Sequence, residues 1–280
     1  MLEAAPTPRP SSTVILLREE QGGPEPGLGP FSVLMLERHG SIAFPGAHVF
    51  PGGIVDAADA DAPGARLPEA QEWAPPGHGD RPPDALPYWV AAARELFEEV
   101  GILLAARGET LLEGPLPPAV VALRTRLHAG VPLPRLLADV GLRLATEQLL
   151  SFARWITPIA NPRRWDTRFL VGRTPPGQDP VVDGTETVSC RWYTPRAALD
   201  AYLAGTIVLI PPTVRTLDDL ARFASVDAVL ADASRRVVRA VTPELVQDGA
   251  RTAISYPDAG GPNVARTLEL RDGRWRPTDD

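Results

Sequence analysis

Three glutamates near the end of one helical segment are the residues of this sequence best suited to chemistry. In Tyr88–Val100, apolar residues recur at helical spacing on one face. At about 100° per residue, Glu95, Glu98 and Glu99 share an arc of roughly 100° on the other face. A hard divalent cation such as Mg²⁺ prefers carboxylate oxygens, so this face predicts a metal site.

Ordinary helix energetics disfavour this arrangement. Glu95 and Glu99 form a like-charge pair one turn apart, which costs a few tenths of a kcal/mol. Glu98 and Glu99 also lie in the last turn, where the helix dipole disfavours each anion by about 0.3–1 kcal/mol. A bound divalent cation would relieve both costs. The alternative is a solvated acidic face with Arg94 as a salt-bridge partner.

A glycine turn and a further carboxylate precede this helix. Gly52 and Gly53 follow Phe50 and Pro51, and Asp59 comes six residues after Gly53. Because glycine lets a ligand approach the backbone closely, we expect Gly52 and Gly53 to contact the substrate.

Together these residues resemble the Nudix hydrolase family. The Nudix box reads G-x5-E-x7-R-E-U-x-E-E-x-G-U, where U is a bulky aliphatic residue, and residues 94–102 match its second half at every fixed position. Gly53 and Asp59 resemble the first half, with Asp in place of Glu, and whether Asp59 takes the role of that glutamate stays open. The spacer, residues 60–93, is 34 residues long instead of seven. This interruption and the stretch 44–59 are similar to the coenzyme A diphosphatase branch of the family, and the resemblance extends over about 12–235.

The resemblance implies an α/β fold, the Nudix α/β/α sandwich, with a mixed β-sheet and a loop–helix–loop catalytic box. It implies metal-dependent hydrolysis of a nucleoside-diphosphate-linked substrate. The branch indicates coenzyme A or acyl-coenzyme A, giving 3′,5′-ADP and (acyl-)phosphopantetheine. One alternative is a diphosphatase for ADP-ribose, NADH or another nucleotide. An alternative of another class is a non-catalytic, ligand-sensing Nudix module.

The same resemblance assigns roles to residues. It implies Mg²⁺ or Mn²⁺ at Glu95, Glu98 and Glu99, with Arg94 orienting a neighbouring glutamate. A further carboxylate from a later loop is expected, and Glu186 is the candidate for a general base or extra ligand. An exposed loop acid is the equally weighted alternative for Glu186.

Arginine must supply any basic side chain that binds phosphate, since all 28 basic residues are arginine. This composition excludes a lysine Schiff base and a P-loop lysine. Arg163, Arg164 and Arg168 flank expected strands and are candidates for binding substrate phosphates, with surface solubility as the alternative.

Several other polar and aromatic residues favour structural roles. His48 is expected to be structural more than catalytic, and Cys190 a small core residue. Trp155, Trp165 and Trp192 are expected in the core rather than stacked on adenine.

The elements that must position the glutamates follow from periodicity and turn residues. Strands are expected at 12–18 and 31–38, which form a hairpin with a long loop, and later at 152–157, 167–172 and 188–193. Helices are expected at 88–100, with Gly101 as a candidate C-cap, and at 195–204 and 213–224, with short helices between 117 and 148. Residues 60–87 contain seven prolines and three glycines, so we expect an insertion there without regular structure. We expect a flexible tail over 1–10, one Nudix domain over 11–280, and within it a C-terminal extension at about 236–280.

Composition narrows the partners. The formal net charge of −7 gives no support to nucleic-acid binding. No apolar run approaches the roughly 18 residues of a membrane span, so no membrane partner is expected. One cysteine and a start without an apolar leader favour a reducing, cytoplasmic location. The expected partner is a small-molecule nucleotide substrate, and the sequence leaves a homodimer open.

Overall fold

A mixed β-sheet forms the centre of the molecule. The computed structural model describes residues 6–20, 30–39, 46–73, 84–184, 187–256 and 267–278. Strands β1 (Arg9–Glu19) and β2 (Phe31–Arg38) pair antiparallel, which confirms the predicted hairpin pairing. On its other side, β1 pairs in parallel with β9 (Trp165–Arg173), and this parallel pair makes the sheet mixed.

The strands of this sheet follow the order β10–β2–β1–β9–β8–β11, with β3 beside β2 and β4 beside β1. The short strand β4 therefore places the glycine turn directly against the central strand β1. The remaining strands of the sheet are β3 (His48–Val49), β4 (Gly52–Ile54), β8 (Leu150–Ile156), β10 (Thr187–Tyr193) and β11 (Ala240–Val241).

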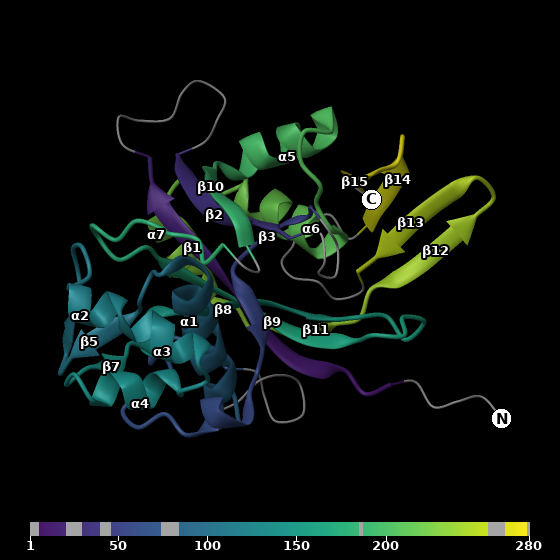
Figure 1. The fold of residues 1–280 in the computed structure, drawn as a ribbon. Coiled ribbons are helices and arrows are strands. Elements are labelled where there is room, and N and C mark those ends of the chain that lie inside the picture. Colours follow the sequence, from purple (N-terminus) through teal and green to yellow (C-terminus); the bar gives the residue numbers. More distant parts are fainter. Residues whose placement is uncertain are drawn as a thin grey trace.

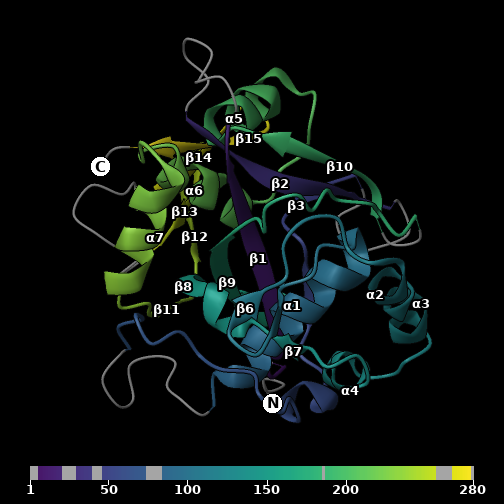
Figure 2. The ribbon, with the colours of Figure 1, turned by 90° about the vertical axis from the view of Figure 1, so that its left-hand side faces the viewer.

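Helices cover both faces of the sheet, which confirms the predicted α/β/α sandwich (Figure 2). On one face, Trp89 and Leu96 of α1 pack with Leu16 of β1 and Leu34 of β2. The other face packs against three helices, among which Leu199, Leu217 and Val229 belong to one apolar core. The helix on the first face is α1 (Leu86–Val100), and the three on the other face are α5 (Pro195–Ala204), α6 (Pro211–Leu220) and α7 (Val226–Arg235).

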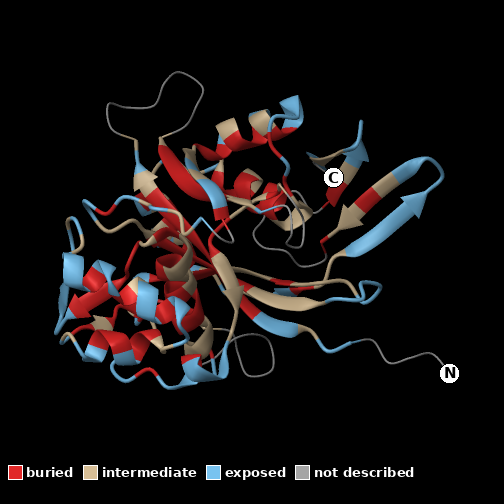
Figure 3. Ribbon diagram, in the orientation of Figure 1, coloured by how far each residue is buried: buried red, intermediate tan, exposed pale blue. Residues whose placement is uncertain are grey.

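A second apolar core lies on the side of α1 that faces away from the sheet (Figure 3). There, Phe97 of α1 packs with Leu127 and Leu133 from the short helices that follow. A small sheet in the order β6–β5–β7 accompanies them, and the sequence analysis did not predict it. The elements are β5 (Ala105–Arg107), β6 (Thr110–Leu111), α2 (Pro118–Val121), α3 (Leu123–His128), α4 (Leu133–Ala138), β7 (Arg143–Leu144) and the 3₁₀ helix η2 (Thr146–Gln148).

The described part of the insertion lies against the body of the protein. It follows the 3₁₀ helix η1 (Ala57–Ala60), and its residues 61–73 form no helix or strand. The buried Gln71 side chain accepts a hydrogen bond from the Ser151 N–H (2.7 Å) and donates one to the Ala233 carbonyl (3.3 Å). These contacts fasten the insertion to β8 and α7.

The C-terminal strands form a separate sheet in the order β12–β13–β14–β15. It joins the body through Tyr202 of α5, whose hydroxyl accepts a hydrogen bond from the Trp275 N–H (2.7 Å). Within the described ranges, no helix has the length and apolarity that a membrane crossing needs. The strands are β12 (Glu244–Asp248), β13 (Arg251–Ser255), β14 (Thr267–Arg271) and β15 (Arg274–Thr278), and Figure 1 shows them beside α5 and α6.

Candidate functional site

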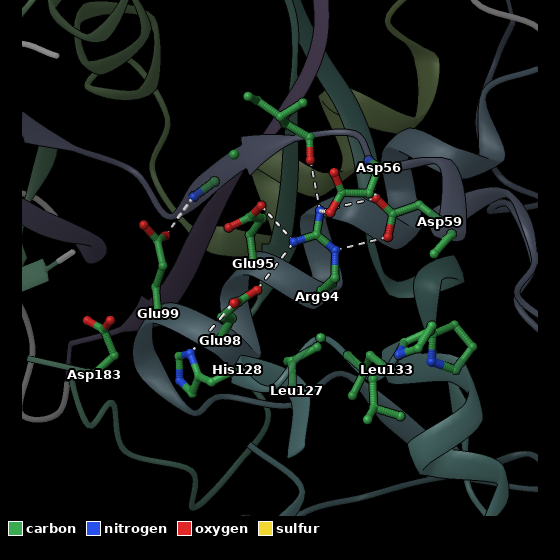
Figure 4. Close-up of a pocket in the computed structure, with 18 of the residues that line it drawn as sticks. Asp56, Asp59, Arg94, Glu95, Glu98, Glu99, Leu127, His128, Leu133 and Asp183 are labelled. Carbon is green, nitrogen blue, oxygen red and sulfur yellow. Dashed lines mark hydrogen bonds and ion pairs between the residues drawn. The ribbon is translucent and has the colours of Figure 1, made fainter. Parts of the chain in front are cut away.

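A cavity of about 460 Å³ opens beside the C-terminal half of α1. It is strongly acidic, because six carboxylates but only two arginines line it within the described chain. The apolar remainder of its lining comes mainly from the connection between α3 and α4. Figure 4 shows the carboxylates, which belong to Asp56, Asp59, Glu95, Glu98, Glu99 and Asp183.

The helix α1 brings its glutamates to the cavity and then ends. Gly101 adopts a left-handed conformation with φ of 69°, and its N–H donates to the Phe97 carbonyl (2.9 Å). This is the C-cap that the sequence predicts, and glycine adopts it without the strain of a Cβ. The polar face with Glu95, Glu98 and Glu99 therefore lies in the last turns, beside the cavity.

Arg94 is the centre of the hydrogen-bond network in the cavity. Its Nε and Nη2 donate to the two carboxylate oxygens of Asp59 at 3.0 and 3.1 Å. Its Nη1 donates to Glu95 (2.8 Å) and Glu98 (3.3 Å), and Nη2 also donates to the Ile54 carbonyl (2.8 Å). These bonds use the five N–H donors that a guanidinium has.

Burial and charge act in opposite directions on this guanidinium. The side chain of Arg94 is only 9% exposed, and burial by itself lowers its pKa. The hydrogen bonds to Asp59 and the charge of Glu95 outweigh burial, so the pKa of Arg94 lies above its ordinary value. Arg94 is therefore a fixed positive charge that holds two of the three glutamates by their carboxylates.

The glycine turn closes the other side of the site. The Gly52 N–H donates to Glu99 Oε2 (2.8 Å). A Cβ on Gly53 would overlap the Glu95 carboxylate, so only glycine lets that carboxylate lie against the turn. The turn itself is held by Thr13 of β1, whose hydroxyl donates to the Pro51 carbonyl (2.6 Å).

The loop between β9 and β10 adds another carboxylate to the cavity. Its Asp183 N–H donates to the Glu99 carbonyl (3.0 Å), and its Val181 N–H donates to the Val100 carbonyl (2.8 Å). Arg124 of α3 connects the same segments, because its Nε donates to the Glu98 carbonyl (2.9 Å) and its Nη1 to the Val181 carbonyl (2.7 Å). The loop and α3 thus satisfy carbonyls at the end of α1 and hold Asp183 beside Glu99.

The donor chemistry of the cavity fits a hard divalent cation. Its six carboxylates supply the oxygen donors that such an ion prefers, and their negative charge exceeds the positive charge of the two arginines that line the cavity. Among the described residues, no three side chains already converge as metal ligands. The hydrogen bonds explain this, since Glu95 and Glu98 point toward Arg94 and Glu99 toward the Gly52 amide.

The structure brings together only some of the residues singled out from the sequence. Arg94, Glu95, Glu98, Glu99, Gly52 and Gly53 all line the cavity, whereas Arg163, Arg164 and Arg168 do not. Arg164 donates to the Thr157 carbonyl (3.0 Å), and Arg168 pairs with Asp166 (3.0 Å) and stacks on Tyr88. Arg163 is exposed. Arg168 lies on β9, and Arg163 and Arg164 lie in the turn just before it. Glu186 lies outside the described residues.

The remaining candidates also occupy positions away from the cavity. His48 does not line it, and its ring meets Tyr193 edge-on with centroids 6.2 Å apart. Trp155 is buried in the core beneath the sheet, and Cys190 and Trp192 pack partly buried on the opposite face. Trp165 is half-buried on β9.

The sequence predicts no role for four charged or titratable residues that line the cavity, namely Arg38, Asp56, His128 and Asp183. Asp59 was noticed only as an uncertain equivalent of a box residue, whereas it is the buried partner of Arg94. Arg38 at the end of β2 and His128 at the end of α3 also line the cavity. His128 Nδ1 lies 3.6 Å from Glu98 Oε1. Only the strand order and the packing of α3 on α1 reveal these neighbours, because they are far from the box in sequence.

A family comparison supports the sequence resemblance. The NUDT19 Nudix domain model matches residues 62–222. Human acyl-coenzyme A diphosphatase NUDT19 is 32% identical over 242 residues, which cover 72% of this chain and 63% of the human protein. The chicken protein of the same name is 30% identical over 78% of this chain and 69% of its own length.

A solved structure shares the architecture. The crystal structure of a Nudix hydrolase from Alicyclobacillus acidocaldarius superposes with a TM-score of 0.66 and 27% sequence identity. The superposition covers 81% of this chain and 97% of that chain.

Proposed function

Since this chain belongs to the Nudix hydrolases, in their NUDT19-type branch, we propose that it hydrolyses the diphosphate of coenzyme A or acyl-coenzyme A. Water adds to one phosphorus, the bridging P–O bond breaks, and the products are 3′,5′-ADP and (acyl-)phosphopantetheine. The names of the human and chicken relatives support the substrate class. The match covers 63% of the human protein, so the substrate is proposed for this chain and not transferred to it.

The observation that carries this proposal is the position of three glutamates in the last turns of α1, at an open cavity. Glu95, Glu98 and Glu99 lie there on one helix face, and Arg94 and Gly52 hold them by hydrogen bonds. Phosphoryl transfer needs positioning and charge stabilisation more than covalent chemistry by the protein. A set of carboxylates, with no serine or cysteine among the described residues that line the cavity, agrees with that requirement.

Nudix chemistry uses a divalent cation, and we propose Mg²⁺ or Mn²⁺ held by Glu95, Glu98 and Glu99. When bound, such an ion neutralises phosphoryl charge and makes water a better nucleophile. The contribution of the protein is to supply oxygen ligands on one rigid helix. Arg94 orients two of these ligands and is itself oriented by Asp59.

Two further residues contribute to this proposed reaction. Arg38 lines the cavity and forms no side-chain ion pair among the described residues, so it is available to bind a substrate phosphate. Asp183 lies beside Glu99 on the β9–β10 loop and is placed to accept a proton from water or to add an oxygen ligand. Glu186, three residues further along this loop, keeps the same role as a prediction from sequence.

A substrate panel tests the proposal. Purified protein is incubated with Mg²⁺ and, separately, coenzyme A, acyl-coenzyme A, ADP-ribose, NADH, dinucleoside polyphosphates and dNTPs, and the products are identified by mass spectrometry. Release of phosphopantetheine is the expected result. If only ADP-ribose were hydrolysed, the proposal of coenzyme A as the substrate would be wrong. If no compound of the panel were hydrolysed, the result would favour a ligand-sensing module.

A further inference from the structure

The wall of the cavity opposite the glycine turn differs from the rest of the site. It is formed by the end of α3, the start of α4 and the residues between them. Its apolar lining consists of Leu127, Val131, Pro132, Leu133 and Pro134, while His128 lines the cavity at the edge of this wall, 3.6 Å from Glu98. Figure 4 shows Leu127 and Leu133 together on one side of the pocket, away from Asp56. A single cavity thus combines a carboxylate face with an aliphatic face.

The backbone of this wall offers little to a charged ligand. The Gly130 N–H donates to the Leu127 carbonyl (2.8 Å), and the Val131 N–H donates to the Arg126 carbonyl (3.1 Å). Pro132 and Pro134 carry no N–H at all. Since the amides of Gly130 and Val131 are used and both prolines lack one, these four positions offer no backbone donor to a phosphate, whereas the aliphatic side chains of the wall suit an uncharged group.

The wall is also poorly suited to a nucleobase. Among the described residues that line the cavity there is no phenylalanine, tyrosine or tryptophan on which adenine could stack. Val131 and Pro132 are half-buried and thus still present surface to a ligand.

We propose that the Leu127–Pro134 wall binds the uncharged, aliphatic arm of the substrate, that is, the pantetheine chain and the acyl group attached to it. The inference rests on the proposed function, and it adds which half of the substrate faces which side of the cavity. In this orientation the diphosphate lies over the glutamates of α1 and the aliphatic arm extends along the wall. The nucleotide half of the bound substrate extends away from the wall. The wall therefore determines the preference of the enzyme for apolar acyl groups.

Binding of the two reaction products separates the two halves of the substrate. The variant is Val131→Asn, which makes the wall polar without adding a charge near the carboxylates. The matched control is Val121→Asn, at an exposed valine of α2 outside the cavity. Each protein is titrated with 4′-phosphopantetheine and, separately, with 3′,5′-ADP in the presence of Mg²⁺ by calorimetry. Circular dichroism checks the fold, and Val131→Ala replaces the first variant if asparagine unfolds the protein.

The expected result is that Val131→Asn weakens binding of 4′-phosphopantetheine about tenfold, the scale of a lost apolar contact, while binding of 3′,5′-ADP stays unchanged. The control should bind both products like the wild type. Equal weakening of both products, no weakening of either, or a wild type that binds no 4′-phosphopantetheine would overturn the inference. The proposed function fails separately, if the wild type leaves coenzyme A and acyl-coenzyme A intact, because the titrations need no turnover.

Discussion

Asp59 holds the Arg94 guanidinium by two parallel hydrogen bonds of 3.0 and 3.1 Å across a gap of 35 residues in sequence. Both side chains are buried, and the Asp59 carboxylate also accepts the Asp56 N–H (2.8 Å). Asp59 is therefore a positioning residue that acts on the site through Arg94. The insertion that begins after it lengthens the box without separating this pair, because η1 returns Asp59 to the side of α1.

Replacing Asp59 should destabilise the protein as well as disturb the site. Asp59→Asn leaves the buried Arg94 with fewer counter-charges, and we expect a loss of about 3 kcal/mol in the free energy of unfolding, at the lower end for a broken buried ion pair. Urea denaturation measures this loss. The matched control is Asp61→Asn, an exposed acid in the same segment. Equal stability of the two variants would contradict the inference that Asp59 stabilises the buried Arg94 guanidinium.

The Asp59–Arg94 pair also marks the limit of what the sequence alone predicts. The second half of the box, the helix over 88–100 and its Gly101 cap were predicted because their signals are local. The helix begins two residues earlier, at Leu86, because Pro87 is tolerated in a first turn. The partner of Arg94 could not be inferred, since Asp59 lies beyond a 34-residue spacer whose path follows from tertiary packing.

The arginines show how a choice by residue type differs from the position in the fold. Arg163, Arg164 and Arg168 are candidates by their type and their place beside strands, but none of them is among the described residues that line the cavity. Arg38 is the cavity-lining arginine that stays available, and only the β2–β3 pairing and the packing around α1 place it there. Composition predicts which residue type must bind phosphate, whereas the three-dimensional fold selects the individual residue.

Arg38→Gln should weaken substrate binding more than it slows the reaction. The loss of a charged hydrogen bond to phosphate is worth about 1.5–3 kcal/mol, so KM for coenzyme A should rise about 10- to 100-fold with a smaller change in kcat. Steady-state kinetics separates the two constants. Arg196→Gln on the exposed side of α5 serves as the control. An unchanged KM would remove Arg38 from the substrate site.

The two acids of the β9–β10 loop can be ranked by substitution. Asp183→Asn should lower kcat by about 100-fold or more, the scale of a lost general base. Glu186→Gln is the matched change three residues away on the same loop. We expect its effect to be smaller, because Asp183 is the acid that lines the cavity among the described residues. A larger loss of kcat in Glu186→Gln than in Asp183→Asn would support Glu186 as the general base, as the sequence predicts.

The stability of the protein should depend on pH through His48. Burial lowers the pKa of His48 below its ordinary value of 6.5, and the nearby charge of Glu37 does not compensate. Between the lower pKa of the folded state and pH 6.5, His48 is therefore more protonated in the unfolded chain than in the folded chain. The resulting stabilisation is complete above pH 6.5 and is lost as the pH falls toward the lower folded-state pKa.

Urea denaturation near neutral pH and at mildly acidic pH tests this dependence. We expect the free energy of unfolding to fall with pH in the wild type and to fall less in His48→Gln. His39→Gln, at an exposed histidine just beyond β2, should keep the dependence of the wild type. If His48→Gln showed the same pH dependence as the wild type, another group would be responsible.

We propose that the carboxylate face of α1 hydrolyses a phosphoric anhydride. The most direct test of this proposal is mass spectrometry of coenzyme A incubated with Mg²⁺ and either the wild type or Glu98→Gln. We predict 3′,5′-ADP and phosphopantetheine from the wild type and neither product when the metal is chelated. In the folded variant we predict a loss of activity of more than about 100-fold, which exceeds the effect of changing a residue that only orients a metal ligand. Intact coenzyme A with the wild type, or equal turnover by Glu98→Gln, would contradict it.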